Sequence, residues 1–419
     1  MNLCLVGINH RTAPVAIREK AAIRVGQLDD SLQLLRACAS QGVILSTCNR
    51  TEVYTATEGH GYAETTSLDF LRRNLAIPEA TLHKHTYVQK GEAVIEHLFR
   101  IASGLDSMIV GEYEVLGQVR QALEAAEKTK MVNLPLRYLF QSAVRTGRRV
   151  REETEISKNA LSVSSVAMDL ATRTIGDLTN CKMLVIGAGE AGRLAAKAAK
   201  DRGAHQIIVA SRTQQRAAAL ALTLGGLPIS MNNLAEELKT CNLVVACADA
   251  PHHILDVNNV SAVIKHRPKL PLVIIDIAVP RNVAPAVAQI DNVFLYNIDD
   301  LTQVSEQNLK QREGATQKAA EIITSEVAEF TVWWRALEIR PVVSALMKKA
   351  ENIRHTQLNK TLKKLRPLSD EEQDSLAAMT KSIVTKILQD PINHLKANGY
   401  NYGDYAEMVR ELFGLEEEN

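Results

Sequence analysis

The sequence lacks paired cysteines. Its six cysteines, at positions 4, 38, 48, 181, 241 and 247, form no C-x-x-C motif and no disulfide-framework spacing. It also lacks a signal peptide at its start and any apolar run near the roughly 18–20 residues that a bilayer span needs. These absences exclude a disulfide-stapled fold and a transmembrane segment. We therefore expect free thiols in a reducing cytoplasm, no membrane contact and no metal site.

Net charge is also nearly absent, since 49 Lys and Arg oppose 48 Asp and Glu. Any nucleic-acid partner must therefore be held by a local basic patch rather than by a global field. Internal repeats and low-complexity segments are lacking too. What is present is 46% hydrophobic residues in a chain of 419, which is too long for one ordinary domain. We expect two or three domains with sizeable cores.

Three regions with different patterns follow one another, and together they predict an α/β multidomain protein. Residues 1–155 mix strands and helices in one α/β domain. In 156–300, short continuous apolar runs alternate with helical stretches, which predicts a Rossmann-type, doubly wound parallel sheet. Between Leu301 and Arg340 there is no proline and one glycine, so a continuous helix there would span roughly 60 Å. We predict a long spacer helix at 301–340 and a helical bundle or dimerisation module at 341–419.

The apolar spacing places individual elements within these regions. Pro14 is well placed to begin a helix, and Gly104 to end another. The predicted strands are 2–8, 43–47, 51–56, 242–248, 272–280 and 293–298, and the predicted early helices are 92–105, 114–130 and 135–152.

The segment "VIGAGEAG" contains a G-x-G-x-x-G motif at Gly187, Gly189 and Gly192. The motif follows an apolar strand and begins an alanine-rich helix, which is the context that dinucleotide binding requires. The first glycine permits the turn, the second lets a pyrophosphate approach, and the third lets helix and strand pack closely. A glycine turn of an unrelated α/β protein is the alternative. The predicted cofactor loop is Gly187, Ala188, Gly189, Glu190, Ala191 and Gly192.

The next strand ends in Ser211, Arg212 and Thr213, with no acidic residue to bind a ribose 2′-hydroxyl. A cation and two hydroxyl groups suit a 2′-phosphate, which favours NADPH over NADH. Alternatively, Arg212 is only a solvated loop cation.

Cys48 lies just past an apolar strand in "VILSTCNRTEVY". A thiolate is the nucleophilic form of cysteine, and nearby cations and N–H donors lower its pKa. Thr47, Asn49 and Arg50 could supply such groups. A lone cysteine is more often a small core residue, but a nicotinamide domain in the same chain favours a nucleophile whose thioester is reduced to an aldehyde.

Polar residues then gather around a glycine-rich stretch. His97 lies on the half-apolar helix at 92–105, where most histidines are structural. The segment 103–120 that follows has glycines at 104, 111 and 117, and it resembles a binding loop more than a packed element. Its polar residues include Ser107, Glu112, Glu114 and Gln118.

Five arginines crowd the predicted helix at 135–152. Such a cluster is usually a solvated face, and a phosphate backbone is the functional alternative. The five are Arg137, Arg145, Arg148, Arg149 and Arg151.

Four motifs in this order resemble the glutamyl-tRNA reductase family: "GINHRTAPVAIREK", "LSTCNRTEVY", "HLFRIASGLDSMIVGEYEVLGQVR" and the glycine turn. The resemblance spans essentially the whole chain, although the C-terminal third matches mainly in helical character. It implies an NADPH-dependent reduction of glutamyl-tRNA to glutamate-1-semialdehyde with release of tRNA, the first step of five-carbon tetrapyrrole (heme) synthesis.

Carried over by motif, the resemblance implies that Cys48 forms a glutamyl thioester. It implies that His97 either protonates the leaving group or orients the substrate. We expect Arg50 to hold the substrate γ-carboxylate through two parallel hydrogen bonds. The implied substrate-binding residues are Thr47, Asn49, Arg50, Ser107, Glu112, Tyr113, Glu114 and Gln118.

The family further implies a V-shaped homodimer, with a spinal helix joining each arm to a C-terminal dimerisation domain. Because Cys48 and the cofactor loop lie in different domains, we expect the NADPH domain to swing toward Cys48, with hinges near 152–160 and 298–304. Direct transfer of the reactive semialdehyde to the next enzyme, an aminotransferase, is a chemical expectation.

Two other functions remain open at this point. One is a cysteine-dependent aldehyde or semialdehyde dehydrogenase that acts on a small acyl substrate without tRNA. The other is a catalytically silent NADPH-binding regulator that scaffolds through its helical tail.

Overall fold

The computed structural model describes residues 2–57, 63–74, 77–157, 162–301, 313–366, 368–397 and 402–415. The chain divides into two compact units, Met1–Ser325 and Glu326–Asn419. The first unit contains two separate sheets, and the second is helical. The predicted domain limits 1–155, 156–300, 301–340 and 341–419 stay predictions, and part of each proposed hinge lies outside the described residues.

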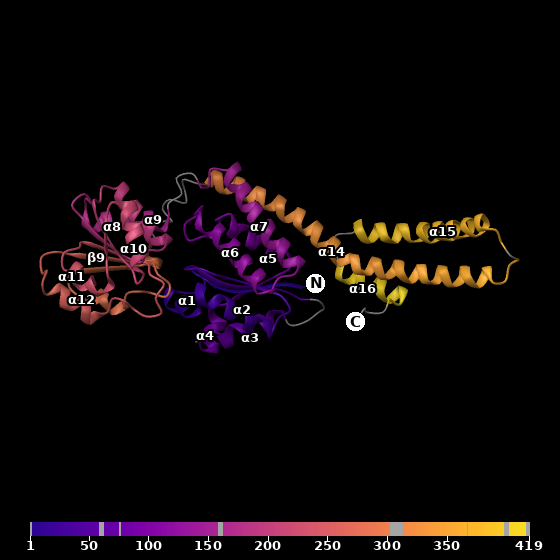
Figure 1. Cartoon of the computed structure of the whole chain (residues 1–419), viewed down its shortest axis with the longest axis horizontal. Helices are drawn as coiled ribbons and strands as arrows, with labels where there is room; N and C mark the ends of the chain where they lie inside the picture. The colour runs from indigo at the N-terminus through magenta and orange to yellow at the C-terminus, as the bar shows by residue number, and fades with distance from the viewer. Residues whose placement is uncertain are drawn as a thin grey trace. The chain divides into compact units, whose positions relative to one another are not determined.

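The first sheet is antiparallel, with strand order β2-β3-β1-β4. Its first three strands are rich in aliphatic and β-branched residues and are almost entirely buried, because helices cover both faces (Figure 1). The predicted strands at 2–8, 43–47 and 51–56 are confirmed. The strands are β1 (Asn2–Asn9), β2 (Gly42–Ser46), β3 (Arg50–Thr57) and β4 (Tyr87–Lys90).

Seven helices surround this sheet in the described part of the chain. Helices α5, α6 and α7 pack on one another, and α3 lies against β1 and β3. On α5 the apolar positions Val94, Ile95, Leu98 and Ile101 are all buried, as their spacing predicts. The helices are α1 (Val15–Ala21), α2 (Leu28–Arg36), α3 (Ala63–Asn74), α4 (Glu79–His85), α5 (Glu92–Ala102), α6 (Glu114–Lys128) and α7 (Leu134–Glu153), with η1 (Val25–Gln27) before α2.

The second sheet has six parallel strands in the order β10-β9-β8-β5-β6-β7, the doubly wound arrangement that was predicted. The chain moves outward in one direction from β5 through β6 and β7, and in the other through β8, β9 and β10. Ligands of such sheets bind at this reversal point, beyond the carboxyl ends of β5 and β8. The strands are β5 (Lys182–Ile186), β6 (Gln206–Ala210), β7 (Leu227–Ile229), β8 (Leu243–Ala246), β9 (Leu272–Asp276) and β10 (Val293–Asn297).

Two buried apolar clusters lie on the two faces of this sheet (Figure 1). Met183 and Val185 point to one face, whereas Leu184 and Ile186 point to the other, because side chains alternate along a strand. Helices α8 (Val163–Ile175), α9 (Glu190–Asp201) and α10 (Gln214–Leu224) cover the first face. Helices α11 (Leu234–Leu238) and α12 (Val257–Ile264) cover the second, with η2 (Met231–Asn233) and η3 (Pro285–Gln289).

The C-terminal part of the chain contains three described helices, α14 (Glu313–Leu362), α15 (Asp370–Ala397) and α16 (Tyr402–Phe413). The long helix was predicted to end at Arg340, but α14 continues through Pro341. A proline inside a helix costs one backbone hydrogen bond, which a helix of this length tolerates.

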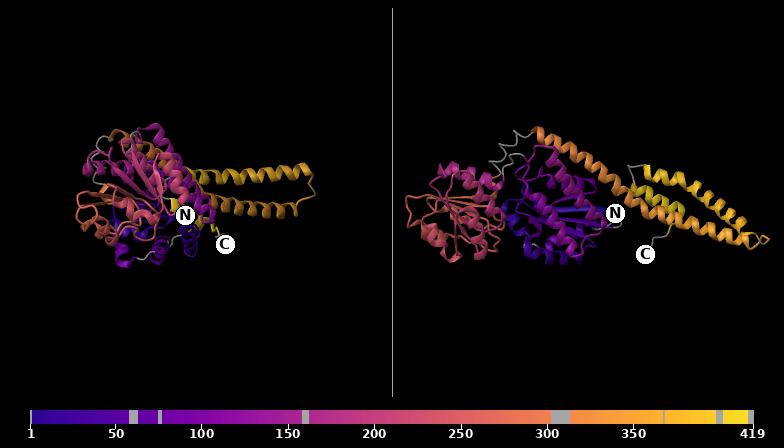
Figure 2. Two further views of the ribbon diagram at one scale, coloured as in Figure 1. Left: turned by 60° about the vertical axis from the view of Figure 1, so that its left-hand side comes forward. Right: turned by 45° about the horizontal axis from the view of Figure 1, so that its top comes forward.

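Within the second unit, helices α14 and α15 run side by side as a hairpin (Figure 2). Arg354 on α14 donates to the Thr380 hydroxyl on α15 at 3.2 Å, and Lys349 donates to the Phe413 carbonyl on α16 at 2.7 Å. No described helix of the chain is both long and apolar enough to cross a membrane.

Candidate active site

The turn between β2 and β3 presents Cys48 at its tip. The Thr47 N–H donates to the Arg50 carbonyl at 2.8 Å and closes the turn. The Thr47 hydroxyl accepts from the N–H groups of Asn49 and Arg50 at 3.1 and 3.2 Å. Three predicted site residues therefore shape the backbone that holds the thiol.

Cys48 packs among apolar side chains from both sheet-containing domains of the first unit. Val15 and Met108 come from the first domain, and Val279 and Ile298 come from segments beside the parallel sheet. Burial, together with the carboxylates of Glu112 and Glu114, raises the pKa of the Cys48 thiol to about 12, and Arg18 opposes them. In this arrangement the thiol is protonated.

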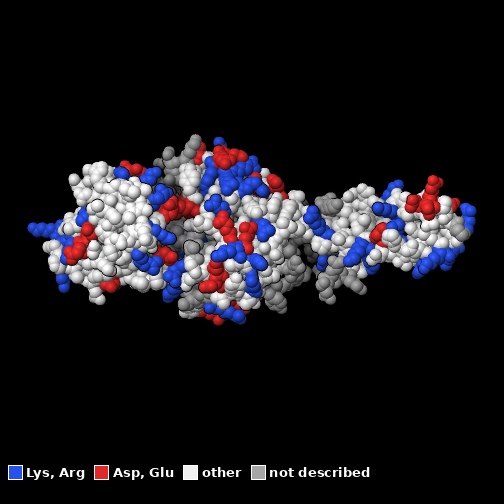
Figure 3. Space-filling model, viewed as in Figure 1, with Lys and Arg blue, Asp and Glu red and all other residues white. Residues whose placement is uncertain are grey.

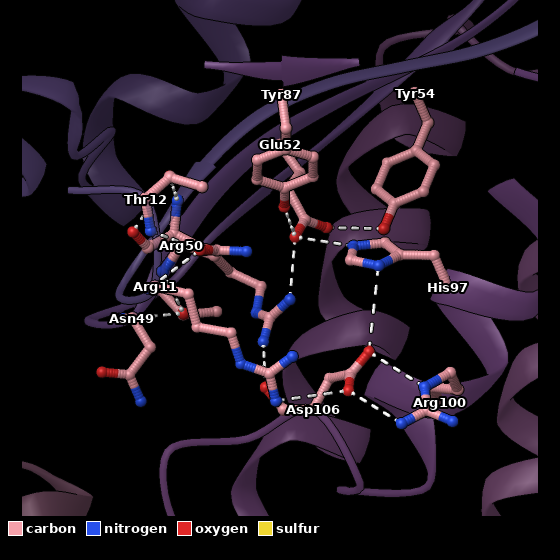
Figure 4. A network of polar contacts seen from close by, with 12 residues as sticks. Arg11, Thr12, Asn49, Arg50, Glu52, Tyr54, Tyr87, His97, Arg100 and Asp106 are labelled. Atoms are coloured by element: carbon pink, nitrogen blue, oxygen red, sulfur yellow. Dashed lines mark hydrogen bonds and ion pairs between the residues drawn. The ribbon is translucent and has the colours of Figure 1, made fainter. Parts of the chain in front are cut away.

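Glu52 is the centre of a buried polar network beside this turn (Figure 4). Its Oε1 accepts from Arg50 Nη1 at 2.8 Å, from the Tyr87 hydroxyl at 2.5 Å and from His97 Nε2 at 3.1 Å. Its Oε2 accepts from the Tyr54 hydroxyl at 2.6 Å. Because a carboxylate only accepts, His97 must carry its proton on Nε2.

Asp106 forms the other end of the network (Figure 4). Its carboxylate accepts from Arg100 Nε and Nη2, both at 3.2 Å, and lies 3.5 Å from Arg11 Nη2. Its backbone carbonyl accepts from Arg50 Nη2 at 2.6 Å, and its Oδ2 lies 3.9 Å from His97 Nδ1. The imidazole of His97 is therefore flanked by two carboxylates.

Charge pairing keeps both carboxylates ionised despite their burial. Burial would raise the pKa of Glu52, but Arg50 and then His97 lower it far below its ordinary value. Burial would likewise raise the pKa of Asp106, which its hydrogen bonds with Arg100 lower instead. Removing one partner would leave a buried charge uncompensated.

The loop between α5 and α6 brings further predicted residues to this region. The Gly111 N–H donates to the Gly104 carbonyl at 2.9 Å, and both glycines have positive φ, at +86° and +78°. A Cβ on Gly104 would lie 3.2 Å from the Gly111 Cα, so the loop closes only with glycine there. This fold buries Ser107 and Glu112.

Glu112 and Glu114 lie at the start of α6, and the pKa values of both carboxyl groups are raised. Burial raises the pKa of Glu112 to about 7, against the neighbouring Ser107 hydroxyl, which lowers it. Burial also raises the pKa of Glu114, and the charge of Glu190 adds to the rise. Gln118 lies one turn after Glu114 on the same helix face.

The structure thus gathers Thr47, Asn49, Ser107, Glu112 and Glu114 around the Cys48 turn and the network of Arg50 and His97. Tyr113 is 63% exposed, and its hydroxyl donates to the Ser157 carbonyl at 3.2 Å. Arg50 differs from expectation, because both of its amino groups already bind protein oxygens, Glu52 and the Asp106 carbonyl.

Three residues of the site were not predicted from the sequence: Glu52, Asp106 and Arg18. Glu52 had a weak signal, since it is a carboxylate inside the β-rich run of residues 50–57, and an ion buried in a strand must find partners. Asp106 and Arg18 gave no such signal, because Arg11 beside Asp106 and Asp299 beside Arg18 come from distant segments.

The glycine turn fits a dinucleotide. Gly187 has φ +122°, and a Cβ on Gly192 would lie 2.2 Å from the Gly187 carbonyl oxygen. A Cβ on Gly189 would meet nothing within 4 Å, so the backbone there is open to a ligand. Gly189 directly precedes α9, whose first turn offers N–H groups to a phosphate.

Ser211, Arg212 and Thr213 follow β6, next to this turn. The Gly187 N–H donates to the Ala210 carbonyl at 2.9 Å, which ties the two loops together. Arg212 is exposed, and its Nη2 donates to the Asp249 carbonyl at 2.7 Å. Its guanidinium is thus held at the rim of the site where a 2′-phosphate would lie.

Two of the five arginines in the cluster on α7 are paired with carboxylates. Arg137 pairs with Glu127 at 2.8 Å, and Arg149 pairs with Glu153 at 2.7 Å. Arg151 points inward and donates to backbone carbonyls, including that of Glu112. Basic and acidic side chains are interspersed over the first unit (Figure 3). Two of the five arginines are thus paired with carboxylates, and the phosphate-binding alternative stays a prediction.

Three protein families match successive parts of the chain. "Glutamyl-tRNAGlu reductase, N-terminal domain" matches residues 6–154, and "Shikimate / quinate 5-dehydrogenase" matches residues 169–304. "Glutamyl-tRNAGlu reductase, dimerisation domain" matches residues 318–415.

Known proteins are similar over the full length. The glutamyl-tRNA reductase of Moorella thermoacetica is 40% identical over 420 aligned residues, which cover 99% of this chain and 95% of that protein. That of Geobacter sulfurreducens is 38% identical and covers 100% and 97%. The solved glutamyl-tRNA reductase of Methanopyrus kandleri is 32% identical, with 99% of both chains covered and a TM-score of 0.53.

Proposed function

The chain belongs to the glutamyl-tRNA reductase family, and from this premise we propose that Cys48 is the nucleophile of its reaction. The protein is an oxidoreductase that reduces glutamyl-tRNA to glutamate-1-semialdehyde, the first step of tetrapyrrole synthesis. The observation that carries the proposal is the position of Cys48 at the tip of the β2–β3 turn, beside the buried network of Arg50, Glu52 and His97.

In the first step, a bond forms between Cys48 Sγ and the glutamyl carbonyl carbon, and the ester bond to the tRNA ribose breaks. The thiol proton is transferred to the leaving ribose oxygen, so no proton is gained or lost in the step. An ester is an activated acyl donor, which makes a strong dedicated base unnecessary.

The charges of the site suit a glutamyl group. Glu112 and Glu114 offer carboxylates for the substrate's ammonium group, and Arg50 offers its Nε–H for the γ-carboxylate. A bound ammonium would offset the two carboxylates that raise the pKa of the Cys48 thiol. Substrate binding would therefore favour the nucleophilic thiolate.

His97 is held in place by Glu52 on Nε2, with Asp106 on its other side. We propose that it orients the site through these two carboxylates, and that its Nδ1, which carries no proton, would accept the thiol proton before giving it to the leaving group.

The parallel-sheet domain is of the dehydrogenase type, and we propose that its cofactor is NADPH. Gly187–Gly192 would hold the pyrophosphate at the start of α9, and Arg212 with Ser211 and Thr213 would hold the 2′-phosphate. When bound, the cofactor supplies the hydride that reduces the thioester to the aldehyde. The Cys48 thiol is regenerated when the aldehyde leaves.

The dimerisation-domain match supports a homodimer through the C-terminal helices. We also propose a cytoplasmic setting, where the six free thiols stay reduced, and direct transfer of the semialdehyde to an aminotransferase.

One experiment tests the proposed nucleophile. The protein is incubated with glutamyl-tRNA and NADPH, and semialdehyde and deacylated tRNA are measured, with Cys48→Ser and free glutamate as controls. We expect product only from the protein with its thiol and only from the charged tRNA. Full activity of Cys48→Ser, or turnover of free glutamate, would refute the proposal.

A further inference from the structure

A single buried arginine connects the nucleophile's turn to the nucleotide-binding domain. Arg18 on α1 is 3% exposed, and its Nη1 donates to the Cys48 carbonyl at 2.5 Å. Its Nη2 pairs with the carboxylate of Asp299, which follows β10. Asp299 Oδ2 also accepts from the Val15 N–H at 2.8 Å. Asp299 therefore reaches the backbone of Cys48 through one guanidinium.

A second ion pair joins the same two domains with the charges reversed. Glu19, next to Arg18 on α1, accepts from Arg281 Nη2 at 2.6 Å and from its Nε at 2.9 Å. Arg281 follows β9, and both side chains are 17% exposed. In one pair the first domain supplies the cation and in the other the anion, so both pairs form together only in one relative position of the domains.

The same contact covers part of Cys48, which is partly buried. Val279 and Ile298, from the nucleotide-binding side, lie in one apolar cluster with Cys48. A tRNA terminus that delivers an acyl group needs an uncovered thiol, whereas reduction needs the nucleotide-binding domain close to it. The two half-reactions therefore require different positions of this domain.

We propose that Arg18 and Asp299 form a docking latch, supported by Glu19 and Arg281, that holds the nucleotide-binding domain over Cys48 for reduction and opens for thioester formation. Arg18 is accordingly a positioning residue. The role of the latch in the reaction rests on the proposed function, whereas the existence of the latch is inferred from the contacts alone.

The first test measures access to the thiol without tRNA or nucleotide. Asp299→Asn removes the charge but keeps an oxygen that can accept from Val15. We expect iodoacetamide to alkylate Cys48 several-fold faster in this variant than in the unmodified protein, as followed by peptide mass spectrometry. Cys38, which is partly exposed on the first domain, is the internal reference.

Asp300→Asn is the matched control, because the Asp300 carboxylate accepts from the Asn297 N–H within its own domain. Its Cys48 should react at the unmodified rate. Equal Cys48 rates in Asp299→Asn, Asp300→Asn and the unmodified protein would overturn the latch.

A charge exchange separates docking from folding. Glu19→Arg and Arg281→Glu each place like charges opposite one another and should speed Cys48 alkylation. The double variant restores an opposite pair and should return the rate toward that of the unmodified protein. A double variant as reactive as the faster single variant would overturn the supporting role of this pair.

The half-reactions link the latch to catalysis. With glutamyl-tRNA alone, Asp299→Asn should form the Cys48 thioester at least as fast as the unmodified protein. With NADPH added in a single turnover, semialdehyde should form about tenfold more slowly. Loss of both half-reactions would overturn the latch. If the unmodified protein made no semialdehyde, the proposed function would fail, and the alkylation results would still decide whether the latch exists.

Discussion

The first unit contains two proposed binding regions that are built in different ways. Around Cys48, charged side chains are buried and already paired with one another, with Glu52 as the shared acceptor of four donors. Around the glycine turn, the site is mainly open backbone at the start of a helix, with an exposed Arg212 at its rim. The first region is specified by charge pairing, and the second by the absence of side-chain volume.

This difference has a chemical reason. The acyl group must be held while a covalent bond forms, so its site needs side chains that do not reorganise. A dinucleotide is bound and released in each turnover, and its phosphates need only N–H groups at close range. Substitutions should therefore act through charge in the first region and through volume in the second.

The largest effect is expected for Glu52→Gln. It leaves Arg50 buried without its ionised partner, so we expect activity to fall at least about 100-fold and stability to fall by about 3–5 kcal/mol. Tyr54→Phe removes one donor to the same carboxylate and should cost only about 1 kcal/mol. Semialdehyde formation and urea unfolding measure both. Activity of Glu52→Gln within a few-fold of the unmodified protein would contradict the charge-pairing account.

Two glycines test the volume account. Gly192→Ala puts a methyl group against the Gly187 carbonyl and should destabilise the nucleotide-binding domain by about 1–3 kcal/mol. Gly189→Ala meets no protein atom, so the fold should persist while NADPH affinity falls roughly tenfold. Thermal unfolding and fluorescence titration with NADPH separate the two effects. Unchanged affinity in Gly189→Ala would show that no ligand approaches this backbone.

The titration of Glu112 sharpens the contrast, because it is a buried carboxyl group with a raised pKa. Its pKa is about 7 in the folded chain against an ordinary 4.5, so its stabilising effect is complete below pH 4.5 and is lost as the pH rises through 7. Glu112→Gln should remove this loss, which at 1.36 kcal/mol per pKa unit is at most about 3 kcal/mol. Unfolding free energies from pH 4.5 to 8 measure it. Parallel pH curves for the two proteins would contradict the prediction.

The smallest effect is expected for Arg212→Ala, since this guanidinium is exposed. We expect the KM for NADPH to rise about tenfold and the KM for NADH to stay nearly unchanged, because only the former carries a 2′-phosphate. Steady-state kinetics are measured with both nucleotides, and the NADH measurement is the control for the NADPH measurement. Equal changes for both would exclude a role in phosphate recognition.

Much of the fold could be predicted because it is encoded locally. The apolar runs at 43–47 and 272–280 became β2 and β9, and the glycine turn lies between a strand and a helix as expected. The end of α14 was not predictable from Pro341, because a single proline is a local signal that a long helix can override.

The candidate site was predictable only where one segment carries it. Thr47, Cys48 and Asn49 lie together in sequence and in space. The partners of Arg50 were not apparent, because Asp106 comes from a loop 56 residues later and takes one of its amino groups. Arg137 on α7 shows the same limit, since its partner Glu127 lies on α6 and meets it only through helix packing.

The two sheets, the helical C-terminal region, the glycine turn and the cysteine at the end of a strand were predictable from the sequence, since each depends on periodicity or on neighbouring residue types. The contacts of Glu52 with Arg50 and His97, and those of Arg18 with Cys48 and with Asp299, 281 residues away, became apparent only in the folded chain. The physical reason is that a buried charge must be paired, and the fold alone determines which distant groups come within reach of it.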